Sequence, residues 1–454
     1  MNSSTSNKLL QNGIFILISC SILIGVLSAF SIQLIALVLV SALTLLAIVS
    51  LSKALLGPAI SSETYDKFLK YLFVVFLFHF LVGLTIFHIK ALENYLGSDA
   101  SEYDSGALGL VMHWRLGYPM PTTLTPGKAG YFYMLASVYW IFGYTPNLGL
   151  VVNNALFSIA VIFLASVTTK LKGETATLNT VILAGFLPGF IIWSSQLLRE
   201  SAVYLCLAIS LWSCVSYLLS SRLKYISLAA FALVILLTMR SDVAFLDGAG
   251  LIIAIVYNSL FTQKTFTQGL GSAAGMLLLA SFLVIFTGSV GYEAIKIVTT
   301  ANLSTLNTIR QSSSTAASGF LTSANITSVS SAVKYLPFGL IYFLAGPFPW
   351  QIHSIRELPA LPDCMLWWIL IPFLFKGLKF LRKNYKGLQL TFTVPALALS
   401  IGLSLIIANF GTAVRERMQV ILILLPVVAI GLTERRKTTQ HSKIKSVTVS
   451  SVAT

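Results

Sequence analysis

The sequence predicts an all-α membrane protein that crosses the bilayer many times. Hydrophobic residues make up 56% of its 454 residues and charged residues only 10%, against roughly 25% charged residues in soluble globular proteins. A soluble fold of this size could not cover its surface with so few charges, and a disordered chain needs low hydrophobicity and high charge. The apolar runs are continuous rather than alternating. Since only helices and closed barrels satisfy the backbone in lipid, helices are expected.

Apolar runs long enough for a bilayer crossing, about 20 residues, recur along the whole chain. The first, residues 12–52, is too long for one span and is expected to form a tight helical hairpin that turns near residues 31–33. Further spans are expected at residues 69–89, 148–169, 178–195, 198–220, 225–239, 243–262, 269–289, 364–380, 389–409 and 418–433. The sequence thus predicts about 12 transmembrane helices in a single membrane domain, residues 1–454.

The net charge of +15, from 30 Lys and Arg against 15 Asp and Glu, indicates membrane topology rather than a nucleic-acid partner. Most of the basic residues fall in short loops on one side of the predicted spans and in the tail, residues 434–454. Short cytoplasmic loops are rich in Lys and Arg, so both termini are expected in the cytoplasm. The short apolar stretch 335–348 would reverse this assignment if it crossed the bilayer. We therefore expect it to be re-entrant or interfacial.

Two long segments, residues 90–147 and 290–334, are then predicted on the outer side. The second is rich in Ser, Thr and Ala, which is typical either of a flexible lid over a site or of a disordered connector. In the first, residues 105–116 and 128–142 are expected to form two helices of three to four turns. These helices are too short to span and carry Trp and Tyr, so they suit the membrane interface.

Asp99 is the candidate catalytic residue of the first outer loop. Asp99 and Tyr103 are four residues apart and would lie on one helical face. A carboxylate at the membrane surface can act as a general base on an acceptor hydroxyl. The other acids of this loop, Glu93, Glu102 and Asp104, are expected only to solvate it. No cofactor is predicted, and a divalent metal ion at Asp99 and Glu102 is left open, because an oxygen site needs more ligands than these two.

Three arginines lie at predicted outer ends of helices, where the cytoplasmic enrichment of Lys and Arg does not explain them. Since guanidinium groups bind phosphate through paired hydrogen bonds, the three are candidates for binding an anionic substrate. The alternative is that each pairs with its acidic neighbour in the sequence. The three pairs are Arg199 and Glu200, Arg240 and Asp242, and Arg415 and Glu416. Lys334, His353 and Arg356 flank the turn at residues 346–350 and are expected to complete the site.

The first outer loop also carries a recognisable pattern of residues. It reads Asp99-x-x-x-Tyr103-x-x-x-Ala107, then Gly117-Tyr118-Pro119, Pro126-Gly127-Lys128-Ala129-Gly130-Tyr131 and Phe142-Gly143. Over about 60 residues this pattern resembles the first external loop of GT-C glycosyltransferases. It is most similar to the dolichyl-phosphate-mannose protein mannosyltransferases and the related bacterial lipid A aminoarabinose transferases. The sequence differs in Ala100, where the family often has a second acid, and in placing this loop after the third span.

The resemblance implies a GT-C-like fold and a transferase that uses a sugar carried on a polyprenyl phosphate. Asp99 would be the base, and Tyr103 would support its helix. Arg199, Arg240 and Arg415 would stabilise the leaving polyprenyl phosphate. Direct displacement by one base would invert the anomeric carbon. The acceptor would be a hydroxyl of a lipid, glycan or protein at the outer face of a bacterial plasma membrane, whose lipids surround the chain.

Two other functions fit parts of the same pattern. A polysaccharide polymerase of the Wzy kind is also multi-span, has outer arginines and uses a lipid-linked oligosaccharide on pyrophosphate. A flippase or transporter of lipid-linked sugars would need charges at mid-bilayer depth and often has internal repeats. Convergence of Asp99 and the arginines on one outer cavity would favour an enzyme. A water-filled route through the bundle lined by these residues would favour transport.

Overall fold

A computed structural model describes residues 32–450 apart from 97, 123, 125–127, 262–302, 316–317 and 353–356. The expected span at residues 269–289 and the first half of the predicted N-terminal hairpin lie outside the described residues. Within them the chain forms helices and no strand, and one isolated antiparallel bridge joins Gly319 and Asn409. The predicted all-α class is therefore confirmed for the described part of the chain.

Seven helices of the described part are long and apolar enough to cross a membrane. They are α2 (Ile32–Leu56), α3 (Ser62–His88), α7 (Pro146–Lys172), α10 (Glu200–Ser220), α12 (Ser241–Phe261), α17 (Ala360–Asn384) and α19 (Phe410–Ser450). An eighth span would consist of α8 (Glu174–Phe186) and α9 (Pro188–Ser194), which meet at a bend of 62°. The chain is thus a multi-pass membrane protein with seven or eight candidate spans in the residues described, whereas ten of the 12 expected spans fall in those residues.

Short apolar helices account for part of this difference. The expected spans 225–239 and 389–409 correspond to α11 (Leu223–Met239) and α18 (Leu390–Ile406), each of 17 residues. Helices of this length reach about 25 Å, against a hydrocarbon core about 30 Å thick. They are at the lower limit of what can span, so length and composition alone do not qualify them as crossings.

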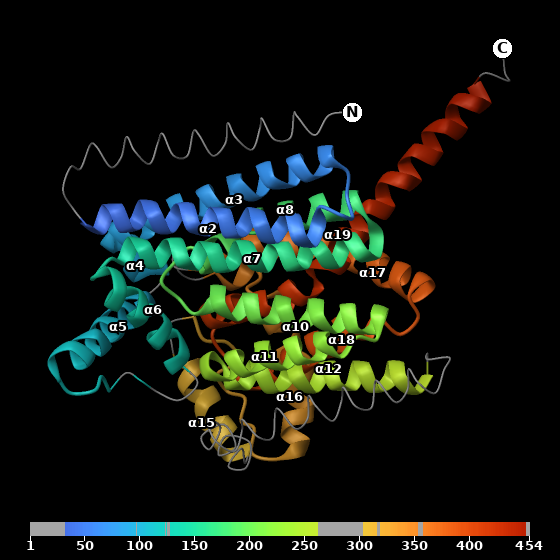
Figure 1. The fold of residues 1–454 in the computed structure, drawn as a ribbon. Helices are drawn as coiled ribbons and strands as arrows, with labels where there is room; N and C mark the ends of the chain where they lie inside the picture. The colour runs from blue at the N-terminus through green and yellow to red at the C-terminus, as the bar shows by residue number, and fades with distance from the viewer. Residues whose placement is uncertain are drawn as a thin grey trace.

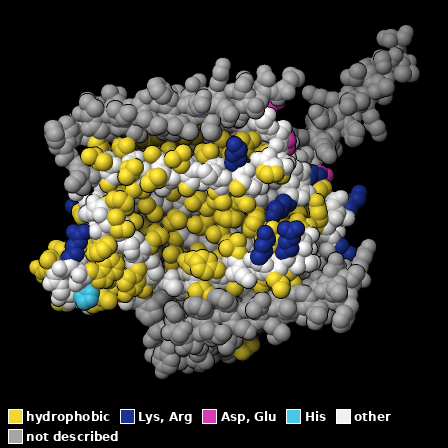
Figure 2. Space-filling model, viewed as in Figure 1, with side chains coloured by type: hydrophobic (Ala, Val, Ile, Leu, Met, Phe, Trp, Pro, Cys, Tyr) yellow, Lys and Arg dark blue, Asp and Glu magenta, His cyan; other side chains and the backbone are white. Residues whose placement is uncertain are grey.

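The long helices lie side by side in one bundle, and α4 (Lys90–Leu96), α5 (Ser98–Leu116) and α6 (Ala129–Phe142) gather at one end of it (Figure 1). The centre of the bundle is α7 and α19, whose apolar windows are 83% and 94% buried, whereas the window of α2 is only 11% buried. A broad band of hydrophobic side chains covers the described surface along the bundle, as Figure 2 shows. This band is the surface that lipid would cover.

The opposite end of the bundle joins segments that the sequence assigns to the cytoplasm. Lys172 at the end of α7 forms an ion pair with Glu434 of α19. Tyr385, after α17, donates a hydrogen bond of 3.1 Å to the carbonyl oxygen of Leu171. The basic ends of these three helices therefore meet, as they must if they share one side of the membrane.

Helices α5 and α6 form the expected pair in the first outer loop. Helix α5 begins at Ser98, seven residues before the expected start, so Asp99 and Tyr103 lie in its first two turns. The ring of Tyr103 packs on those of Tyr131 and Phe132 in α6, at centroid distances of 5.0 and 4.9 Å. Tyr103 therefore fixes the start of α5 against α6.

Asp104 has a structural role that the sequence did not predict. Its carboxylate accepts hydrogen bonds of 2.6 Å from the hydroxyls of Tyr139 and Tyr144. The expectation that Asp104 only solvates the loop is wrong, because the carboxylate joins α5 to the end of α6. The neighbouring acid Glu102 faces Lys128 at 3.7 Å, with both side chains more than a third exposed.

The short apolar stretch before α17 forms α16 (Val329–Ala345), and both of its ends contact the same end of the bundle. Near its start, the guanidinium of Arg310 lies over the ring of Tyr335 at 4.5 Å. Arg310 belongs to α15 (Leu303–Ser314), and Ser313 of that helix accepts a hydrogen bond from the amide of Ala408. After its end, the carbonyl oxygen of Gly346 accepts a 2.7 Å bond from Arg417 of α19. These contacts hold α16 against α15 and α19, and the re-entrant or interfacial placement of this segment stays a prediction.

Candidate functional site

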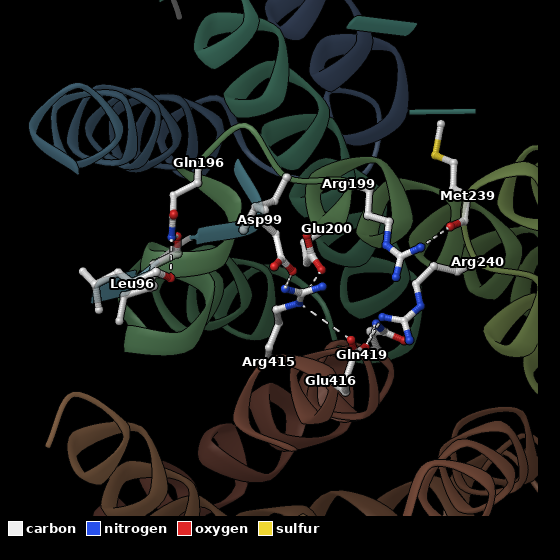
Figure 3. A network of polar contacts seen from close by, with 12 residues as sticks. Leu96, Asp99, Gln196, Arg199, Glu200, Met239, Arg240, Arg415, Glu416 and Gln419 are labelled. Atoms are coloured by element: carbon white, nitrogen blue, oxygen red, sulfur yellow. Dashed lines mark hydrogen bonds and ion pairs between the residues drawn. The ribbon is translucent and has the colours of Figure 1, made fainter. Parts of the chain in front are cut away.

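Arg415 joins the first outer loop to the core of the bundle. Its Nη1 lies 2.6 Å from Oδ2 of Asp99, and its Nε lies 2.8 Å from Oε1 of Glu200 (Figure 3). Asp99 stands at the start of α5, Glu200 at the start of α10 and Arg415 in the second turn of α19. The Arg415 side chain is 15% exposed and that of Glu200 is fully buried, whereas Asp99 is 45% exposed. Asp99 is therefore the member of this group that an outside molecule can reach.

A second arginine continues the network. Arg240, between α11 and α12, pairs with Glu416 of α19 and lies 3.2 Å from Asp242. Glu416 also accepts a 2.6 Å hydrogen bond from Gln419 and lies 3.7 Å from Nε of Arg415. The two arginines are thus connected through one buried carboxylate.

Arg199 lies at the same end of the bundle, just before α10. Its Nη1 donates a 2.8 Å hydrogen bond to the carbonyl oxygen of Met239, the last residue of α11 (Figure 3). A cation at the C-terminus of a helix is favoured because the final carbonyl groups carry partial negative charge. Arg199 therefore connects α10 to the segment that carries Arg240.

We name these groups the outer charge network. It contains four carboxylates and three guanidinium groups, so it carries no excess of positive charge. The alternative of pairing with the acidic neighbour is present for two of the three arginines, because Arg240 pairs with Asp242 and Arg415 approaches Glu416. Its members are Asp99, Glu200, Asp242, Glu416, Arg199, Arg240 and Arg415.

The network controls the protonation of Asp99. Partial burial alone would raise the pKa of this carboxyl, but the charge and hydrogen bond of Arg415 outweigh burial and hold the pKa below its ordinary value. Lys128 and Arg199 add smaller effects in the same direction. Burial raises the pKa of Tyr103 to about 12, so this hydroxyl stays neutral. Asp99 is therefore ionised at neutral pH and able to accept a proton.

A second, fully buried ion pair lies beside the network. Nη2 of Arg417 is 3.0 Å from Oδ2 of Asp363 at the start of α17, and both side chains are at most 2% exposed. Arg417 also donates to the carbonyl oxygen of Gly346 and lies 3.2 Å from the sulfur of Cys364. Arg417 thus fixes the connection between α16 and α17 against α19.

The break between α8 and α9 is held by side chains from distant helices. Pro188 has no N–H to donate at this point, and the next amide, that of Gly189, donates 3.0 Å to Oδ1 of Asp363. The carbonyl oxygen of Gly185 lies 2.9 Å from Nε2 of His79, whose Nδ1 lies 2.7 Å from the hydroxyl of Ser194. The carbonyl can only accept, so Nε2 carries the proton and Ser194 donates to Nδ1.

A pocket of about 100 Å³ opens between this break and the network. Trp193 of α9 lies on its wall, and the same ring lies 6.0 Å from the guanidinium carbon of Arg415. Leu96 also lines the pocket, and its carbonyl oxygen accepts a 3.5 Å hydrogen bond from Gln196 (Figure 3). The remaining lining residues are Tyr95, Gly189, Ile192, Pro359, Ala360, Asp363, Gly411 and Val414.

The structure brings together most of the predicted site residues. Asp99, Arg199, Arg240 and Arg415 belong to one network, and Tyr103 lies one turn after Asp99 on α5. Lys334 is an exposed residue of α16 and forms no ion pair among the described residues, so its inclusion in this network is not supported. His353 and Arg356 lie outside the described residues.

The buried members of the site are harder to predict from the sequence. From the sequence, Glu200 and Glu416 are predicted only as neighbours of an arginine, yet each contacts an arginine that is distant in the chain. A buried acid is stabilised by a cation or by hydrogen bonds, so an acid beside an apolar run indicates a partner elsewhere in the fold. Among the residues that the structure describes, no cluster of three or more His, Cys, Asp or Glu side chains could hold a metal ion.

The sequence matches no protein-family model, and no curated protein is similar to it. The outer charge network and the pocket are therefore the features that bear on function.

Proposed function

We propose that the chain is a GT-C-like membrane glycosyltransferase that moves a sugar from a polyprenyl-phosphate donor to an acceptor hydroxyl. The reaction would occur at the outer face of a bacterial plasma membrane, with both termini in the cytoplasm. The observation that carries this proposal is the contact between Asp99 and Arg415. It brings a reachable carboxylate of α5 directly against the guanidinium group of Arg415 in α19, which Glu416 connects to Arg240.

The chemistry needs one base and one stabilised leaving group. Asp99 accepts the proton of the acceptor hydroxyl while its oxygen attacks the anomeric carbon. A new carbon–oxygen bond forms as the bond from that carbon to the phosphate oxygen breaks, and the configuration inverts. The polyprenyl phosphate leaves as an anion, which Arg415 and Arg199 would stabilise. Arg240 would add a third positive charge through its pairing with Glu416.

The charges of the network indicate how the donor would activate the base. Every phosphate oxygen that approaches Arg415 competes with Asp99, because the guanidinium already pairs with this carboxylate. Loss of that pairing would raise the pKa of Asp99 towards its ordinary value and make it a stronger base. The base would therefore become effective when the donor phosphate is in place.

The two alternatives predict different substrates. A polymerase of the Wzy kind would use the same outer arginines with an oligosaccharide on pyrophosphate, and the network alone fits it as well. Transport is supported by one observation, the buried carboxylate of Asp247 on α12, which accepts a 2.8 Å bond from Ser210. Ionisable groups inside a membrane domain often mark a transport path. The other charges described above lie at helix ends, which favours an enzyme.

The test is transfer of a radiolabelled sugar from polyprenyl phosphate in membranes that contain the native chain or Asp99→Asn. The substitution keeps the size of the side chain and removes the base, so transfer should fall at least about a hundredfold. Glu102→Gln is the matched control, because it removes a neighbouring loop carboxylate that contacts only Lys128 among the ion pairs of the described residues. Equal transfer by the native chain and Asp99→Asn would exclude Asp99 as the base.

The same membranes distinguish the alternatives. Activity only with an oligosaccharide on polyprenyl pyrophosphate would indicate the polymerase. Movement of the lipid-linked sugar between leaflets without formation of a new glycosidic bond would indicate a transporter.

A further inference from the structure

The pocket beside Trp193 lies next to the outer charge network but shares none of its seven residues. Its walls come from α4, α9, the start of α17 and the start of α19. Two features connect the pocket to the network. The ring of Trp193 lies near the guanidinium group of Arg415. Tyr95 and Leu96 line the pocket and precede α5, whose first turn carries Asp99. A group in this pocket would therefore be held close to the contact between Asp99 and Arg415.

The pocket is built by the break between α8 and α9. The Gly189 amide binds Asp363, and a side chain at this position would meet Oδ1 of Asp363 at 2.9 Å and collide with the sulfur of Met418. The close approach of α9 to α17 and α19 thus requires glycine. The bend then directs the last turn of α9, with Trp193, towards the network rather than along the axis of α8.

The chemistry of the walls selects the kind of group that fits. One wall is a large aromatic ring, and most other lining side chains are apolar. The lining carboxylate, Asp363, is already occupied, because one oxygen accepts from Gly189 and the other pairs with Arg417. No described residue that lines the pocket carries a positive charge. The carboxylate of an anionic sugar would therefore have no partner in the pocket, whereas an uncharged ring with one apolar face could stack on the indole.

We propose that this pocket binds the sugar ring of the lipid-linked donor, that this ring is an uncharged pyranose, and that Trp193 is the residue on which it stacks. The proposal rests on the transferase function proposed above and adds the class of sugar. A pocket of about 100 Å³ has no room for an oligosaccharide, and a single ring stacked on Trp193 would lie partly outside it. The phosphate would then lie at Arg415 and the anomeric carbon between the pocket and Asp99.

Binding to the full chain in lipid nanodiscs tests the pocket separately from catalysis. The probes are undecaprenyl phosphate alone and undecaprenyl phosphate that carries glucose, galactose, mannose, N-acetylglucosamine or glucuronic acid. We expect at least one of the four uncharged sugars to increase affinity over the bare carrier by about tenfold. We expect no increase for the glucuronic acid conjugate.

Variants of Trp193 identify the source of that increase. Trp193→Ala should remove it and leave the affinity for bare undecaprenyl phosphate unchanged, whereas Trp193→Phe, which keeps an aromatic ring, should retain most of it. Trp140→Ala is the matched control, because Trp140 is a 51% exposed residue of α6 that does not line the pocket. Thermal unfolding of each variant shows whether the fold is intact.

The outcomes separate the two proposals. No increase with any uncharged sugar, an equal increase in Trp193→Ala, or strongest binding of the glucuronic acid conjugate would each overturn the sugar pocket while the bare carrier still binds. Absence of binding by every probe, the bare carrier included, would overturn the transferase proposal and the pocket together.

Discussion

At the scale of single residues, the site depends on contacts that are distant in the sequence. Asp99 and Arg415 are 316 positions apart. The sequence predicts Asp99 from its loop and the family resemblance, and Arg415 as a charge at a helix end. Both are singled out because charges are scarce in this chain. Their contact could not be predicted, because it depends on how α5 and α19 pack. The same holds for Glu200, whose full burial is visible only in the fold.

The first prediction concerns the pH dependence of transfer. Arg415 lowers the pKa of Asp99, so the base should stay ionised, and the acid limb of kcat/KM for the native chain should lie below the ordinary range of an aspartate. Arg415→Gln removes that cation and the pKa of Asp99 should rise. The acid limb of the remaining activity should then move upwards by about one to three pH units.

Two further variants make this measurement specific. Lys128→Gln should shift the acid limb in the same direction but by less, because its effect on Asp99 is smaller. Arg382→Gln, at the far end of α17, should leave it in place. An unchanged acid limb in Arg415→Gln would show that Asp99 is not the group that titrates.

At the scale of helices, the sequence located the spans better than their interruptions. The sequence predicts one span at residues 178–195, and the structure divides it into α8 and α9 at Pro188. A proline inside a helix predicts a break. What stabilises a bend of 62° is His79 from α3 and Asp363 from α17, which bind the backbone groups of Gly185 and Gly189. These two partners are distant from Pro188 in the sequence, so they could not be predicted from the residues around the break.

The second prediction concerns this break. His79→Phe keeps an aromatic ring beside Phe157 but leaves the carbonyl oxygen of Gly185 without its bond. An unsatisfied buried acceptor typically costs about 1–3 kcal/mol, so the unfolding midpoint in detergent should fall by several degrees. His88→Phe is the control, since His88 is exposed at the end of the same helix. Equal midpoints for the native chain and His79→Phe would show that this bond does not stabilise the break.

The third prediction concerns the close contact between α17 and α19. A methyl group on Gly377 would collide with the carbonyl oxygen of Val427, and one on Gly431 with that of Phe373. Small residues allow such backbone contact between membrane helices. Either glycine-to-alanine substitution should therefore destabilise the fold by about 1–3 kcal/mol.

Thermal unfolding in detergent measures this effect. Ile369→Ala on α17 is the control, because Ile369 is 61% exposed and its loss opens no gap between these helices. Because α19 carries Arg415, loss of sugar transfer should accompany the loss of stability in the glycine variants. Stability equal to that of the native chain would show that the two helices can separate without cost.

At the scale of the whole molecule, one bundle carries chemically different ends. The outer charge network, α5 and α6 lie at one end, and the basic ends of α7 and α17 meet at the other. The sequence predicts this difference between the two ends, because Lys and Arg are concentrated in the short loops on one side of a membrane protein. It did not predict the number of helices long enough to span. The helices α11 and α18 have 17 residues each, and at this length the hydrophobic stretch alone does not decide whether a helix crosses the bilayer.

The fourth prediction is that the two ends of the bundle face opposite sides of the membrane. Glu102→Cys places a thiol on α5, and Arg222→Cys places one in the exposed connection between α10 and α11. A membrane-impermeant maleimide should label Glu102→Cys in intact cells and Arg222→Cys only after the membrane is opened. The native chain provides the background, and its described cysteines, Cys206, Cys214 and Cys364, are all buried.

The labelling pattern tests the proposed reaction as well as the orientation of the chain in the membrane. If Arg222→Cys is labelled in intact cells and Glu102→Cys is not, Asp99 faces the cytoplasm, and a polyprenyl-phosphate donor would have to be used before it crosses the membrane. If both are labelled from the same side, α10 does not cross the bilayer between Glu200 and Ser220. The two ends of the bundle would then not face opposite sides of the membrane, which would contradict the topology on which the proposed reaction depends. Labelling from opposite sides in the expected order is therefore required by a transferase whose base and leaving-group contacts lie at the outer surface.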